Sequence, residues 1–432
     1  MKIHLYCNTL NTSFYLCKYL REKGHDAVMF LDHISPFEQD YPWWEDPTLS
    51  PTSLPSWIKY YEVVPKFAKP QPLTQQMIKD FSDCDVALVW GMGPILAMKA
   101  GVPFFFCSLG TDLNNIKMQE KIPLAIERYM KGAPSIGTVS NSRVFNPTGE
   151  TYSAVDKIIH YYLQRKALYK ADYLGVAMGY QINPYVKGLG VYHKMKHIRI
   201  PWDINKYSPQ PNEALNKKYE SYDVVYFAPA RHSWSSVWED LKGNNKYLIA
   251  FARFVKEYKP NVKLITIDKG VDLERSKALI KEHGIEAYIE WLPQLNKTEI
   301  RTYNSIPNAV FVDQFFHDEW YKRYPKDKEQ VRSGFGFAAI EALAAKRPII
   351  TTFTDEEFYE GNHPPILSAF TIDEIYNRFV ESWKMTQTER NALGEKAQAF
   401  AFQYHHWETT IDLYINVLED IVAKHKAKPE NN

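Results

Sequence analysis

A glycine-rich loop followed by a short apolar helix is the stretch of this sequence best suited to bind an anion. Gly334, Phe335 and Gly336 lie between a strand-like apolar run and the apolar helix predicted for 337–345. Glycine permits positive φ and lets a ligand approach the backbone. The first N–H groups of a helix have no partner within it and favour an anion. We therefore expect backbone N–H groups from Gly334 to Phe337 to meet phosphate or sugar oxygens.

The predicted helix after this loop is apolar on every face except at Glu341. Such a helix should be buried, and a buried carboxylate needs hydrogen-bond partners. If phosphates lie at the helix start, a ribose one turn further along would donate its hydroxyls to Glu341. The alternative is a buried βαβ helix whose glutamate is paired for structural reasons.

Two cations follow the strand predicted for 223–228, namely Arg231 and Lys242. A departing phosphate gains negative charge that must be stabilised, and Arg can fork two phosphate oxygens while Lys acts as a point charge. Considered by itself, each of these two cations would be interpreted as a surface residue or a salt-bridge partner. Lys269, at the next strand end, either approaches a nucleotide or caps a turn. No convincing Asp-x-Asp pair occurs in a strand-end loop, so we expect no metal and no cofactor.

The first half offers no comparable phosphate loop, because the turn after its first strand contains no glycine. Asn11 and Thr12 in this polar turn are expected to face the transferred sugar or an acceptor. Thr111 and Asp112 follow another predicted strand, where ligand groups gather in parallel sheets. The alternative for Asp112 is an Asx-turn or a helix cap.

Strands alternate with helices in both halves, which predicts parallel sheets covered by helices on both faces. A Pro-rich connection at 201–211 separates the halves, and 35–72 reads as an irregular insertion, either an acceptor- or membrane-contacting flap or a loop packed on the surface. The predicted strands are 2–6, 27–31, 86–90, 102–107, 171–176, 223–228, 263–267, 287–290, 309–315 and 349–353. The predicted helices include 12–23, 152–170, 273–283, 297–305, 337–345, 372–385, 388–404 and 407–423.

Composition narrows the class of protein. The chain has 432 residues, 45% of them hydrophobic, and a formal net charge of +1, which argues against a dedicated nucleic-acid binder. Neither a run of about twenty apolar residues nor a signal-peptide pattern is present. The four cysteines form no CxxC motif, which favours free thiols in a reducing cytosol. We expect a soluble cytoplasmic protein, with peripheral contact to the inner face of the membrane as a further expectation.

The glycine-rich stretch resembles the nucleotide-sugar motif of glycosyltransferase family 4. That motif reads glutamate, Gly-Phe-Gly, a second glutamate eight positions after the first, Ala-x-Ala, a Gly and a Pro; here Ser333 replaces the first glutamate and Lys346 the last Gly. Arg231 and Lys242-Gly243 resemble the pair that clamps the donor diphosphate in this family. The segment around Leu292 resembles the one whose backbone meets the base.

The resemblance implies an α/β fold of the GT-B type, with two Rossmann-like domains facing each other across a cleft. Residues 1–205 would form the acceptor-side domain, 206–405 the donor domain, and 406–432 a helix returning to the first domain. The implied activity is retaining, metal-independent transfer of a hexose from a nucleotide-diphosphate sugar, expected to be UDP-linked, to a saccharide or lipid-linked acceptor.

In this reading Arg231, Lys242 and Asp112 are the catalytic residues. The residues expected to bind substrate are Glu341, Gly334, Phe335, Gly336, Phe337, Leu292, Lys269, Asn11, Thr12 and Thr111. Ser333 cannot carry charge, so a sugar contact must change or come from Glu329 or Gln330. The rivals are a GT-B epimerase or phosphorylase, and a non-catalytic nucleotide-sugar-binding protein.

Overall fold

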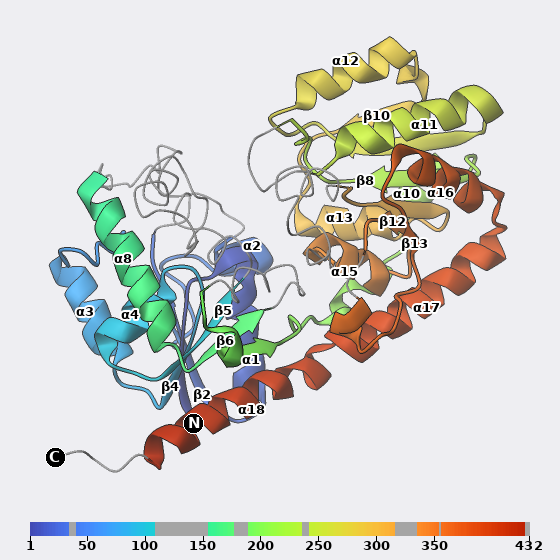
Figure 1. The fold of residues 1–432 in the computed structure, drawn as a ribbon. Coiled ribbons are helices and arrows are strands. Elements are labelled where there is room, and N and C mark those ends of the chain that lie inside the picture. Colours follow the sequence, from blue (N-terminus) through green and yellow to red (C-terminus); the bar gives the residue numbers. More distant parts are fainter. Residues whose placement is uncertain are drawn as a thin grey trace. The chain divides into compact units, whose positions relative to one another are not determined.

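Two parallel β-sheets, each with helices packed against it, form the scaffold of the protein (Figure 1). The computed structural model describes residues 1–33, 40–108, 154–176, 189–235, 242–315, 335–353 and 356–427. The described chain divides into two compact units. The first contains the described residues up to Trp202 together with those from Trp407 onward, and the second runs from Asp203 to His406.

The first unit is built on a seven-stranded sheet in the order β3-β2-β1-β4-β5-β6-β7, with every pair of neighbours parallel. The order reverses between β1 and β4, which is the switch point of a doubly wound sheet. The strands are β1 (Lys2–Tyr6), β2 (Asp26–Leu31), β3 (Ile58–Tyr60), β4 (Val86–Val89), β5 (Phe104–Ser108), β6 (Tyr173–Val176) and β7 (Met195–His197). The helices are α1 (Thr12–Glu22), α2 (Pro42–Glu45), α3 (Pro72–Phe81), α4 (Gly93–Ala100), α8 (Ala154–Lys170) and α18 (Trp407–Lys426).

The second unit repeats this plan with a six-stranded parallel sheet in the order β10-β9-β8-β11-β12-β13. Its switch point lies between β8 and β11. The strands are β8 (Val224–Ala228), β9 (Val262–Ile267), β10 (Ile289–Leu292), β11 (Ala309–Val312), β12 (Ile349–Thr351) and β13 (Leu367–Ser368). The helices are α10 (Glu213–Tyr219), α11 (Asn244–Tyr258), α12 (Leu273–His283), α13 (Lys297–Asn304), α15 (Phe337–Ala344), α16 (Ile372–Lys384) and α17 (Gln387–His405).

The strands at the centre of each sheet are buried on both faces. All four residues of β4 and all five of β8 are buried, as expected where helices cover a parallel sheet on both sides. In the second unit, Tyr226 of β8 meets Phe379 of α16 edge-on with ring centroids 4.8 Å apart. This packing fixes the carboxyl ends of the strands, from which the loops discussed below emerge.

The last helix belongs to the first unit. The Trp407 ring of α18 stacks on Tyr19 of α1 at 4.8 Å, and Lys23 pairs with Asp412 at 2.9 Å. The Trp407 backbone N–H donates to the Trp202 carbonyl at 3.0 Å. The chain therefore leaves the first unit after Trp202 and returns to it at Trp407.

The stretch 35–72 is more regular than the sequence indicated. Its described part contains the helix α2 and the strand β3, whose Ile58 pairs in parallel with Met29 of β2. Pro55 lies three residues before Ile58, and β3 is three residues long at the sheet edge. A strand this short gives no detectable alternation, so the sequence did not predict it, whereas most of the other described residues of this stretch are irregular as expected.

Lys346 takes the backbone conformation that a glycine would favour, with φ of 57°. Its N–H donates to the Leu343 carbonyl and that of Arg347 to the Ala342 carbonyl, both at 3.0 Å. These two bonds form a Schellman motif, so the end of α15 keeps its regular shape and the left-handed residue carries the strain. Within the described chain, no helix is long and apolar enough to cross a membrane.

Candidate functional site

The carboxyl edge of the second sheet brings together loops that are far apart in sequence. Arg231 lies three residues after β8, Lys269 two residues after β9, and Gln314 two residues after β11. Because β9, β8 and β11 are neighbours in the sheet, these three side chains start from one edge, around the switch point. Open parallel sheets bind ligands at this position.

Two of these loops are joined by backbone hydrogen bonds through His232. Its N–H donates to the Lys269 carbonyl at 2.7 Å, and its carbonyl accepts from the Asp272 N–H at 3.0 Å. Gly270, with φ of 132°, lies so close that a Cβ there would come within 2.2 Å of the His232 carbonyl oxygen. This close approach sets Arg231 and Lys269 at a fixed separation along the edge.

A buried carboxylate, that of Asp272, orders the turn after His232. It accepts from the Trp234 N–H at 2.7 Å and the Ser235 N–H at 2.8 Å, and also contacts the Ser235 hydroxyl. Burial acts to raise its pKa, but these hydrogen bonds and the charge of Arg275 outweigh it, and the pKa of Asp272 lies below the usual value. The ionised carboxylate therefore fixes the start of the segment that leads towards Lys242.

Two hydrogen bonds hold Lys242 against the residues that follow β11. Its half-buried Nζ donates to Gln314 Oε1 at 3.0 Å, and its carbonyl accepts from the Phe315 N–H at 3.0 Å. Gly243, with φ of 66°, leaves room for this contact, because a Cβ there would be 2.5 Å from the Phe315 carbonyl oxygen. Lys242 and Gly243, which follow β8 in the chain, therefore contact the residues that follow β11, on the other side of the switch point.

The electrostatics of this edge favour an anion. Burial lowers the pKa of Lys242 to about 8, with Arg231 adding to this effect and Asp313 opposing it. Burial likewise lowers the pKa of Arg231, and burial followed by the charge of Arg231 lowers that of Lys269. Burial raises the pKa of Asp313 to about 6. Because Arg231 and burial both disfavour the charged forms of the two lysines, an added anion would stabilise these cations.

The glycine loop lies next to this group. Gly336 caps α15, and a Cβ on it would come within 3.2 Å of Gln314 Nε2. Phe335 is buried and stacks on Phe353 at 4.8 Å, which anchors the described part of the loop. Phe337 begins the helix with its side chain half-buried. Gly334 and Ser333, with Glu329 and Gln330, lie outside the described residues.

Glu341 has a charge partner that the sequence did not suggest. Its Oε1 lies 3.6 Å from Nζ of Lys297, at the start of α13. Glu341 is buried, whereas the Lys297 side chain keeps 20% of its exposure. Leu292, at the end of β10, is also buried and lies five residues before Lys297. Both the ribose and the structural interpretation of Glu341 agree with its pairing to Lys297.

In the first unit, the two described residues predicted to meet substrate donate side-chain hydrogen bonds to backbone carbonyls of that unit. Asn11 is fully buried, with positive φ, and its amide donates to the Tyr41 carbonyl at 3.0 Å. The Thr12 hydroxyl donates to the Thr9 carbonyl at 2.8 Å. Their contact with substrate stays a prediction. Thr111 and Asp112 lie outside the described residues.

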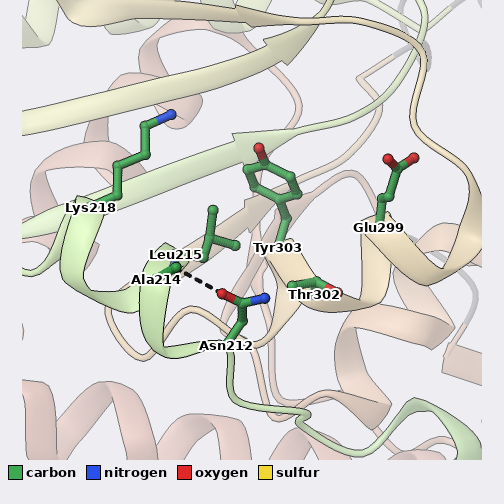
Figure 2. A pocket seen from close by; sticks show the side chains of 7 residues that line it. All are labelled: Asn212, Ala214, Leu215, Lys218, Glu299, Thr302 and Tyr303. Carbon is green, nitrogen blue, oxygen red and sulfur yellow. Dashed lines mark hydrogen bonds between the residues drawn. The ribbon is translucent and has the colours of Figure 1, made fainter.

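A pocket of about 390 Å³ lies between α10 and α13, away from the predicted residues. Figure 2 shows its lining side chains, with the Asn212 side chain accepting from the Leu215 N–H at 2.9 Å. The lining residues are Asn212, Ala214, Leu215, Lys218, Glu299, Thr302 and Tyr303. Glu299 is occupied in capping α13, and none of the three cations contributes.

The lowered pKa of Lys242 predicts that binding of an anionic nucleotide at this edge would depend on pH. Its cationic form predominates below pH 8 and is lost above it, so the affinity for UDP should fall as the pH rises from 7 to 9. Binding at pH 9 should also take up a proton, which calorimetry detects as a heat that changes with the ionisation enthalpy of the buffer. The control is Lys242→Arg, because Arg keeps its charge and should abolish the proton uptake. Equal uptake in both proteins would contradict this assignment.

Part of the second unit is similar to a known protein family. The family model described as Glycosyl transferases group 1 matches residues 236–357, a segment that includes Lys242, Lys269, Gln314 and Glu341. This match supports the coarser part of the sequence prediction, a glycosyltransferase domain in the second half of the chain. The narrower family 4 assignment stays a prediction. No curated protein matches the chain in sequence.

Solved structures share the whole architecture. Anabaena HepE in complex with UDP and glucose has a TM-score of 0.63 at 13% identity, over 97% of this chain and 100% of HepE. A Rickettsia africae glycosyltransferase scores 0.62 at 13% identity, over 100% and 99%. Thermosynechococcus elongatus sucrose-phosphate synthase scores 0.60 at 13% identity, over 98% and 99%. The predicted GT-B fold is thus confirmed, and with the group 1 domain it indicates an enzyme of the glycosyltransferase class.

Proposed function

We propose that the protein transfers a hexose from a UDP-sugar to a saccharide or lipid-linked acceptor, with retention of configuration and without a metal ion. The observation that carries this proposal is the grouping of Arg231, Lys242 and Lys269 beside Gly336 at the switch point of the second sheet. The match of 236–357 to a glycosyltransferase domain supports it. The presence of UDP and glucose in HepE supports the choice of donor.

In the proposed reaction the bond between the hexose C1 and the β-phosphate oxygen breaks, and its electron pair stays on the phosphate. The acceptor hydroxyl oxygen forms the new bond to C1, and its proton passes to the departing diphosphate. Arg231 and Lys242 stabilise the charge that develops on this diphosphate, which is the largest electrostatic demand of the step. Lys269 neutralises the nucleotide-side phosphate, and the Gly336–Phe337 backbone meets the phosphates or the sugar.

Glu341 holds the ribose in this proposal, with Lys297 orienting its carboxylate. In the other unit, Asn11, Thr12, Thr111 and Asp112 are proposed to face the sugar or acceptor. Peripheral contact with the membrane, a cytoplasmic location and independence of cofactors belong to the same proposal. A glycosyltransferase that elongates polysaccharides would have these properties.

Calorimetric titration of UDP, GDP and ADP, each with and without EDTA, tests the donor site. We expect one nucleotide, UDP, to bind with an affinity that EDTA leaves unchanged and that Glu341→Ala lowers at least tenfold. The matched control is Glu395→Ala, which removes an exposed carboxylate paired with Lys346 and should bind normally. Absence of binding by all three nucleotides would contradict the proposal. Binding without turnover of UDP-glucose in the presence of saccharide acceptors would instead favour a non-catalytic nucleotide-sugar-binding protein.

A further inference from the structure

Gln314 is held at the switch point by contacts at both its backbone and its side chain. Its carbonyl accepts from the Thr352 N–H at 3.2 Å, which ties the end of β11 to the loop after β12. Its Oε1 accepts from Lys242 Nζ at 3.0 Å. A long side chain that is fixed in advance loses little conformational freedom when it contacts a ligand.

The contact with Lys242 decides which way the amide of Gln314 faces. An ammonium group can only donate, so the group turned to Lys242 must be the amide oxygen. The NH₂ group must then face the other way. In that direction lies Gly336, where a Cβ would be 3.2 Å from Nε2. Because Gly336 has no Cβ, the NH₂ group of Gln314 can lie directly beside the start of α15.

We propose that Gln314 is a donor-binding residue whose amide NH₂ group donates a hydrogen bond to a hydroxyl oxygen of the transferred hexose. This inference rests on the proposed function, because it deepens the same site. Gln314 thus acts on both parts of the donor, holding Lys242 for the diphosphate with one end of its amide and contacting the sugar with the other.

The order of strands favours the sugar over the phosphates as the partner of Gln314. Along the sheet edge the order runs β10, β9, β8 and β11, and these strands carry Leu292, Lys269, Arg231 and Gln314 in turn. If the base of a nucleotide-diphosphate sugar lies at β10, as the resemblance of the Leu292 segment implies, its phosphates lie at the cations and its hexose at β11. A neutral amide also suits a neutral hydroxyl, since fixed polar groups orient ligands by hydrogen bonds.

Gln314 lies close to the motif in which serine replaces a glutamate. Ser333 stands where the motif has a glutamate expected near the donor sugar, and it cannot carry that charge. Gln314 supplies a polar contact to the hexose from the neighbouring strand end. The contact differs in kind, because an amide NH₂ donates to a hydroxyl oxygen whereas a carboxylate accepts from the hydroxyl.

The test compares the affinities for UDP and UDP-glucose in the wild type, Gln314→Ala and Gln314→Met. Methionine keeps the length of the side chain while removing both polar ends. We expect UDP-glucose binding to weaken roughly three- to tenfold more than UDP binding in both variants, as for the loss of one hydrogen bond. Gln75→Ala is the matched control, since it removes an exposed amide in α3 that donates to the Pro70 carbonyl just before the helix. It should change neither affinity.

The outcomes separate this inference from the proposed function. Equal weakening of UDP and UDP-glucose would overturn the inference, because Gln314 would then act only through Lys242 or the phosphates. Unchanged affinities in both variants would overturn it as well. In either case the proposed donor site would stand, since the wild type binds UDP. A wild-type protein that binds neither ligand would overturn both.

Discussion

Replacement of Arg231 by alanine is expected to lower kcat for transfer from UDP-glucose at least tenfold. Its guanidinium lies at the end of β8, in the field of Lys242 and Lys269, and burial holds its pKa below the usual value while leaving it cationic. A half-buried cation acts through a lower dielectric than one in water, so its effect on a developing phosphate charge is larger. Loss of this charge should affect the transition state more than the bound donor.

Steady-state kinetics of the purified variants test this expectation. Arg231→Lys should recover part of the lost kcat, because it restores the charge without the two-pronged contact. Arg253→Ala is the control. It removes an exposed arginine that pairs with Asp373 on the surface of the same unit, and its kinetics should match the wild type. Unchanged kcat and KM in Arg231→Ala would remove this residue from the site.

Replacement of Gly270 by alanine should cost on the order of 3 kcal/mol in the free energy of unfolding. A Cβ at this position would meet three backbone atoms of His232 between 2.2 and 2.7 Å away, and backbone cannot move aside as a side-chain end can. Relief of the clash requires the loops after β8 and β9 to separate. The affinity for UDP should therefore fall together with stability, because Arg231 and Lys269 would lose their fixed separation.

Gly284→Ala provides a closely matched comparison. Gly284 also has positive φ, at 61°, but no atom lies within 4 Å of the position of its Cβ. Alanine there should cost only about 1 kcal/mol, from backbone strain alone, with normal UDP affinity. Urea unfolding of both variants measures the loss of stability that the clash causes, and calorimetry measures its effect on the affinity for UDP. If the two variants were equally stable, the tight packing of Gly270 on His232 would not hold in solution.

The sequence allowed the doubly wound plan to be predicted because the evidence for it is local. Buried strands such as 224–228 are continuous apolar runs, and helices such as 273–283 show their own periodicity and a terminal glycine. The glycine loop and the cations that follow β8 were also selected as candidate site residues from residue type and position. Each of these features involves residues close together in the chain.

The residues that sequence reasoning missed depend on contacts between distant segments. Gln314 is separated from Gly336 by a charged insertion, and a single glutamine after a strand has no distinctive chemistry until Lys242 fixes its amide. Lys297 becomes notable only through the proximity of Glu341, 44 positions later in the chain. Asp272 reads as an ordinary helix start. The one signal available was its place in the Asp268–Asp272 segment after a strand.

The return of the chain at Trp407 has a consequence for synthesis on the ribosome. The second unit is continuous from Asp203 to His406, whereas the first lacks α18 until the final segment has been made. The N-terminal sheet thus emerges early but waits with the Tyr19 surface uncovered while some two hundred residues are added. The later unit is the one able to complete its fold first, and the nascent first unit exposes apolar surface to chaperones while the second unit is synthesised.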